Sequence, residues 1–129
     1  MTEPALDARF HPELETPSAK PSFTEAYGLR HYHIALSVRG APNDTHTATY
    51  DLDPTYTPPQ ISSNEPPVFP VILTSYGDYI VRARLYGRHN TLPHRVECSL
   101  GTLLRQHYIK KFSNIPAAVE DIINKIEHL

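Results

Sequence analysis

The alternation of apolar and polar residues through the middle of the chain predicts a β-sheet domain. From residue 30 onward the period is two, and one face of the first run carries Tyr32, Ile34, Leu36 and Val38. This alternation is typical of a strand with one buried face. Similar runs follow at residues 45–52, 68–74, 79–86 and 94–100. The pattern therefore predicts an all-β domain over residues 29–100.

Turn-forming residues separate these strands. Six prolines between residues 53 and 70 cannot donate hydrogen bonds to a sheet, so we predict loop and edge structure there. A tight turn at Tyr76-Gly77-Asp78 joins the two strands that follow.

From residue 101 the apolar period becomes helical. Residues 102–111 and 113–129 place apolar side chains three or four positions apart, and Pro116 suits the first turn of the second helix. We predict a C-terminal helical extension over residues 101–129, packed on or beside the sheet domain. Its apolar stripe either covers that domain or docks another protein through Ile122 and Ile126.

The first 28 residues show no steady apolar period. Four prolines are spread among charged and small residues, so little burial is available to offset the entropy lost on ordering. We predict a mostly flexible tail over residues 1–28, in which Phe10, Phe23 and Tyr27 are the residues able to anchor a short edge strand.

Charge and composition narrow the classes of partner. The chain has 12 Lys and Arg against 14 Asp and Glu, so its net charge of −2 gives no overall attraction to nucleic acid or to anionic membranes. The basic cluster of Arg82, Arg84, Arg88 and Arg95 fits a solvated outer sheet face as well as an acidic partner. With one cysteine and no long apolar run, we expect a soluble cytoplasmic protein.

A search for catalytic and metal-binding motifs is negative. The sequence has no glycine-rich phosphate loop, no paired CxxC, no HExxH and no serine flanked by glycines. His31 and His33 lie two apart on one strand face, which suits two metal ligands, but no cysteine or carboxylate pair accompanies them. We therefore predict no enzyme, no metal and no cofactor. A metal-dependent enzyme that uses these histidines is the weakest of the hypotheses kept open.

Two tyrosines stand out because each lies in a turn. Tyr56 follows Pro54 and Thr55, and Tyr76 precedes Gly77, so neither occupies an inward strand position. Their rings either present flat faces to a ligand or cap the end of the core.

The order of five short segments resembles the YEATS domain family, and more specifically the prokaryotic YEATS-type (pYEATS) domains. The segments are IALSVRG ending at Gly40, TYDLDPTY at 49–56, PPVF at 66–69, SYGDY at 75–79 and the closing strand at 96–100, within a match over about residues 30–100. The resemblance implies an immunoglobulin-like β-sandwich. It also implies a binding module in which aromatic side chains from two loops flank an acylated lysine.

Transferred by position, the resemblance implies a ligand site at one end of the sandwich. Tyr56 and Tyr76 form the aromatic pair, Thr55 supplies a hydroxyl, and Gly77 allows close approach of the backbone. Asp53 lies at the mouth of this pocket, where a carboxylate favours a cation.

Two functional hypotheses follow. The first is a non-enzymatic recognition module that binds a protein or peptide with a modified lysine, acylated lysine included. The alternative is an adaptor in a bacterial signalling or defence assembly. It binds an effector protein through Ile122 and Ile126 of the C-terminal helix, without reading acyl-lysine.

Overall fold

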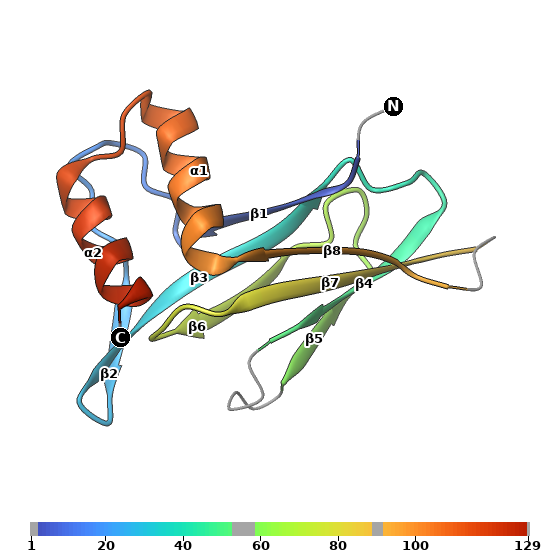
Figure 1. Cartoon of the computed structure of the whole chain (residues 1–129), viewed down its shortest axis with the longest axis horizontal. Coiled ribbons are helices and arrows are strands. Elements are labelled where there is room, and N and C mark those ends of the chain that lie inside the picture. The colour runs from blue at the N-terminus through green and yellow to red at the C-terminus, as the bar shows by residue number, and fades with distance from the viewer. Residues whose placement is uncertain (1–2, 53–58, 89–91, 129) are drawn as a thin grey trace.

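The computed structural model of the protein describes residues 3–52, 59–88 and 92–128. Two four-stranded antiparallel sheets lie face to face, and two helices follow the last strand and cover one side (Figure 1). This arrangement confirms the predicted β-sandwich with a C-terminal helical extension. Neither of the two described helices is long and apolar enough to cross a membrane.

The first sheet is built around one long strand. Its members are β1 (Ala5–Phe10), β2 (Phe23–Ala26), β3 (Leu29–Arg39) and β6 (Val71–Ser75). β1 and β2 pair with successive stretches of β3, and β6 pairs with the middle of β3.

The second sheet has the order β5-β4-β7-β8. These strands are β4 (Thr45–Asp51), β5 (Gln60–Ser63), β7 (Ile80–Gly87) and β8 (His94–Ser99). The register pairs Asp51, the last residue of β4, with Arg82 near the start of β7. The loop after β4 and the turn before β7 therefore leave the sheet at the same end.

The core lies between the sheets. The first sheet buries the face of β3 that the alternation predicts: Tyr32, Ile34, Leu36 and Val38. The second sheet contributes Ala48, Tyr50, Val81, Ala83 and Leu85. The hydroxyl of Tyr50 is buried and donates a hydrogen bond to the backbone oxygen of Phe69 at 2.7 Å.

The N-terminal segment is part of this core, so the expected flexible tail over residues 1–28 is wrong for the residues described from Glu3 onward. β1 pairs with β3 from Ala5 opposite Arg39 to Phe10 opposite Ile34. The physical reason is that apolar residues alternate with polar ones over a few positions of the segment, so that Leu6, Ala8 and Phe10 are buried. The expected edge strand near Phe23 is β2.

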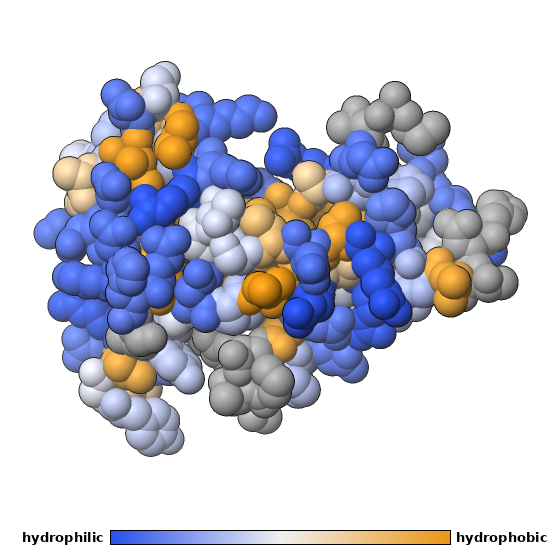
Figure 2. Space-filling view, in the orientation of Figure 1, coloured by the Kyte–Doolittle hydropathy of each residue, from blue (hydrophilic) through white to orange (hydrophobic). Residues whose placement is uncertain are grey.

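The helices close the side of the sandwich next to β1 and β8. α1 (Leu100–Phe112) begins directly after β8, and the Ser99 hydroxyl accepts a hydrogen bond from the backbone nitrogen of Thr102. The buried residues of α1 are Leu100, Gly101, Leu103, Leu104 and Tyr108. α2 (Ala117–Glu127) packs on α1 and buries Val119, Ile123 and Ile126. Figure 2 shows a mainly hydrophilic surface over α2, as expected when its apolar stripe faces inward.

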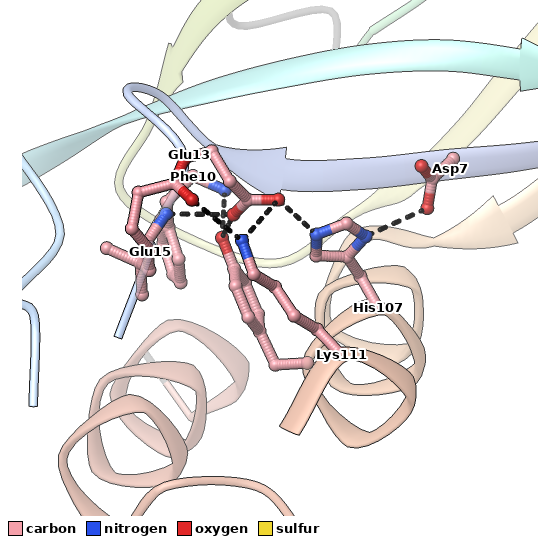
Figure 3. A network of polar contacts seen from close by, with 8 residues as sticks. Asp7, Phe10, Glu13, Glu15, His107 and Lys111 are labelled. Carbon is pink, nitrogen blue, oxygen red and sulfur yellow. Dashed lines mark hydrogen bonds and ion pairs between the residues drawn. The ribbon is translucent and has the colours of Figure 1, made fainter. Parts of the chain in front are cut away.

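A polar network ties the segment after β1 to α1 (Figure 3). We call it the N-terminal clamp, and its residues are Asp7, Glu13, His107, Tyr108 and Lys111. Within it, His107 Nε2 lies 2.6 Å from Glu13 Oε2, and His107 Nδ1 lies 3.5 Å from Asp7 Oδ1. The Tyr108 hydroxyl donates to Glu13 Oε1 at 2.7 Å and accepts from the backbone nitrogen of Phe10 at 2.9 Å.

The clamp shifts the titration of its own groups. Hydrogen bonding to Asp7, and then to Glu13, raises the pKa of His107 although burial opposes the shift. The contact with His107 lowers the pKa of Asp7. Burial raises the pKa of Glu13, but hydrogen bonds from Tyr108 and His107 outweigh it, and the net pKa is below the ordinary value. The two carboxylates therefore favour the charged imidazolium, which persists to a higher pH than in a free histidine.

Candidate ligand-binding site

One of the predicted ligand residues, Tyr76, borders a hollow at one end of the sandwich. Tyr76 and Gly77 lie in the turn between β6 and β7, and Tyr76 lines a hollow of about 470 Å³. The other walls are the tip of the β2–β3 hairpin, Tyr32, and the C-terminal half of α2 with His128. We call this space the tip hollow.

Tyr76 is held in place and remains accessible. Its ring is partly exposed and meets the His31 ring edge-on, with the ring centroids 5.2 Å apart. His31 in turn lies 3.3 Å from the backbone oxygen of Ala26 through Nε2. The hairpin of β2 and β3 thereby fixes one side of an aromatic ring that borders the hollow.

The turn that carries Tyr76 is fixed to both helices. The Ser75 hydroxyl donates to the backbone oxygen of Gly77 at 2.7 Å. The backbone nitrogen of Asp78 donates to the oxygen of Ile126 at 3.1 Å, and Asp78 Oδ1 accepts from the nitrogen of Gly101 at 2.9 Å. One turn residue therefore satisfies groups at the start of α1 and at the end of α2.

Asp78 is the residue supporting the turn that the sequence reasoning missed. In sequence it is an ordinary turn carboxylate, and the helix start next to Gly101 was the one available signal, because helix N-termini attract carboxylates. Many carboxylates in the chain meet that description, so the contact between Asp78 and the helices could be identified only from the folded structure.

The remaining ligand residues that the resemblance implied are not among those described. Asp53, Thr55 and Tyr56 lie outside residues 3–52, 59–88 and 92–128. The two strands that flank them are described: the backbone nitrogen of Leu52 donates to the oxygen of Pro59 at 2.8 Å. The pairing of Tyr56 with Tyr76 stays a prediction.

The apolar stripe of α2 faces the protein itself. Ile126 is 2% exposed and borders the tip hollow, and Ile122 is partly buried against the core. Neither side chain offers an open apolar surface to a partner in this fold.

Three arginines of the cluster, Arg82, Arg84 and Arg95, lie on the outer face of the second sheet, as its alternation predicts. Arg82 and Arg84 border a hollow of about 580 Å³ together with Arg95. Two carboxylates pair with two of these arginines: Asp51 accepts both bonds of a bidentate pair with Arg84, each at 2.9 Å, and Glu97 pairs with Arg82 at 2.9 Å. Hydrogen bonding to Asp51 raises the pKa of Arg84.

The described histidines and carboxylates form no evident catalytic or metal site. Both ring nitrogens of His107 contact carboxylates, so neither is available as a general base. His33 lies 3.0 Å from the Thr24 hydroxyl through Nε2, and His31 packs on Tyr76. No group of three His, Cys, Asp or Glu among the described residues could hold a metal ion.

Comparison with known proteins finds partial similarity to solved structures. No family model matches the chain, and no curated protein matches it. A crystal structure of yeast Yaf9, an AF-9 homologue, is 20% identical with a TM-score of 0.49, over 75% of this chain and 63% of that one.

Two further structures of the Yaf9 YEATS domain are similar at the same level. The domain recognising an H3K122suc peptide is 19% identical with a TM-score of 0.45, over 73% of this chain and 64% of that one. The domain bound to H3K27ac is 19% identical with a TM-score of 0.47, over 78% and 75% of the two chains. This chain spans just under two thirds of the first two structures.

Proposed function

We propose that this protein is a non-enzymatic recognition module that binds a peptide with an acylated lysine in the tip hollow. One observation carries the proposal: Tyr76, on a turn fixed to both helices, borders a hollow of about 470 Å³ at the loop end of the sandwich. The turn belongs to a segment, SYGDY, that resembles the aromatic turn of YEATS domains.

The size and the lining of the hollow suit such a side chain. Ligand pockets in proteins are commonly about 300–1,000 Å³, and this hollow lies within that range. An acylated lysine has an apolar stem and a planar, uncharged amide, which an aromatic ring contacts with little desolvation cost. Tyr76 supplies that ring.

The charges around the hollow favour a neutral ligand over a cationic one. Arg30 and Lys125 both border it. Asp121, a carboxylate that also borders it, already pairs with Lys125 at 3.1 Å. An unmodified lysine would bring a third ammonium or guanidinium charge into this group, whereas acylation removes that charge.

A fixed turn lowers the ordering cost of binding. Asp78 holds the turn through two hydrogen bonds to the helices, so the ring of Tyr76 needs little rearrangement to receive a ligand. This support is why we assign the helical extension to the recognition module and not to a separate docking function.

A peptide titration tests the proposal. Peptides of one sequence carry a central lysine that is unmodified, acetylated, propionylated or butyrylated, and calorimetry measures their affinity. We expect at least one acylated peptide to bind at least about tenfold tighter than the unmodified one, and Tyr76→Ala to weaken that binding by about tenfold or more. Equal affinity for all four peptides would contradict the proposal.

Two control variants separate ligand contact from folding. Tyr76→Phe keeps the ring and should keep the affinity within about threefold. Tyr86→Ala removes a partly exposed tyrosine on the outer face of the second sheet, so it should leave the affinity unchanged. Circular dichroism of each variant checks that the sandwich is intact.

A further inference from the structure

Three residues other than glycine have a left-handed backbone within the described chain. They are Tyr27 with φ of 54°, Phe69 with φ of 51° and Ser113 with φ of 68°. Residues with a side chain adopt this conformation at a cost in stability, so each case needs a compensating interaction or a role in function.

Two of the three have a structural reason. Phe69 is 1% exposed, its nitrogen donates to the oxygen of Glu65 at 3.0 Å, and its oxygen accepts the hydroxyl of Tyr50. Ser113 is the C-cap of α1, a position at which helices commonly turn left-handed. Packing, hydrogen bonds and helix termination explain these two residues.

Tyr27 lacks any such compensation. Its side chain is fully exposed, at 100%, and it forms no hydrogen bond, ion pair or ring contact with any described residue. It is the first of two residues between the paired positions Ala26 and Leu29, and Gly28 follows with φ of 75°. Such a turn favours Asn-Gly or Gly-Gly, so the phenol ring does nothing for the hairpin.

The position of this ring next to the tip hollow is informative. Gly28, Leu29 and Arg30 line the hollow, so the hairpin tip forms part of its rim. Figure 1 shows the hairpin of β2 and β3 projecting beyond the sandwich beside α2. A hollow of about 470 Å³ suits one modified side chain, so the neighbouring residues of a bound peptide must lie across the rim.

We infer that Tyr27 is a second ligand-contact residue, whose ring packs on the peptide segment next to the lysine held at Tyr76. The inference rests on the proposed function and adds a subsite to it. An aromatic ring on a two-residue turn offers a large contact area and loses little conformational entropy on binding. The strained backbone and the exposed ring are then explained by contact with the ligand.

A comparison of long and short ligands tests the inference. The long probe is the tightest acylated peptide of the titration above, and the short probe is the same acylated lysine blocked at both ends. Tyr27→Asn should lower the affinity for the long peptide by about fivefold. The affinity for the short probe should not change, because that probe has no flanking segment. Tyr27→Phe should keep both affinities.

The same variant has a predicted effect on stability that is opposite in sign. Asparagine tolerates the left-handed turn, so Tyr27→Asn should raise the midpoint of thermal unfolding by about 3 °C. The same variant should lower the affinity for the long peptide. Equal binding of the long peptide by wild type and Tyr27→Asn would overturn the inference alone. Failure of the wild type to bind any acylated peptide would overturn both the inference and the proposed function.

Discussion

A single buried hydroxyl joins a strand of the second sheet to the loop before β6. Tyr50 donates to the oxygen of Phe69, whose left-handed backbone positions its ring in the core. Tyr50→Phe leaves that carbonyl without the bond, and we expect a loss of about 1–2 kcal/mol in the free energy of unfolding. Urea unfolding measures it, with Tyr86→Phe on the outer face as the control. An unchanged midpoint would show that water replaces the bond.

At the scale of single residues, the sequence predicts which way a side chain points better than it predicts its hydrogen-bond partners. The period of two places Tyr32 and Ile34 inward because a strand alternates its faces whatever surrounds it. The contacts of Asp78 with α1 and α2 join residues more than 20 positions apart, and only the fold specifies them. The local pattern of apolar and polar residues does not indicate contacts between residues so far apart in the sequence.

At the scale of elements, the N-terminal clamp predicts a stability that depends on pH. The pKa of His107 is raised above its ordinary 6.5, so its contribution is complete below that pH and is lost as pH rises through the raised value. The pKa values of Asp7 and Glu13 are lowered from 3.8 and 4.5, so their contributions are complete above those values and are lost on acidification. The clamp is therefore strongest between these limits.

The measurement is thermal unfolding of wild type and His107→Gln across this range. The difference between them should be largest near about pH 5.5 and smaller at about pH 9, once the wild-type imidazole is neutral. His46→Gln, at an exposed histidine, is the control. A difference that does not vary with pH would mean that His107 stabilises the fold by packing alone.

The clamp also explains why β1 was not predicted. Its buried residues, Leu6, Ala8 and Phe10, form a pattern too short to be distinguished from a proline-rich tail. Contacts from α1, about 100 positions later in the chain, supply the remaining stabilisation. A strand that depends on a distant helix leaves little trace in its own sequence.

At the scale of the whole molecule, the C-terminal helix is part of the folding unit. Val119, Ile123 and Ile126 are buried, and three such side chains contribute roughly 5 kcal/mol or more, which is comparable to the stability of a small domain. Removal of residues 113–129 should therefore abolish cooperative thermal unfolding. Ala118→Ser, at an exposed position of α2, should leave it intact. A truncated chain that unfolds cooperatively would show that the sandwich is independent.

The overall architecture followed from the sequence because each of its signals is local. Alternating runs predicted β3, β4, β6, β7 and β8, and a change of period predicted the helices. The tip hollow is less predictable, because its walls come from a hairpin, a turn and α2, which meet only in the folded chain.

The tip hollow has a practical consequence for the design of fusion proteins. His128 lines the hollow, so a purification handle or fluorescent partner joined close to it would begin beside the entrance that the proposed ligand uses. Figure 1 shows the N-terminus at the opposite end of the molecule. Immobilisation or labelling there would leave the entrance open, and a C-terminal handle would act as a tethered competitor.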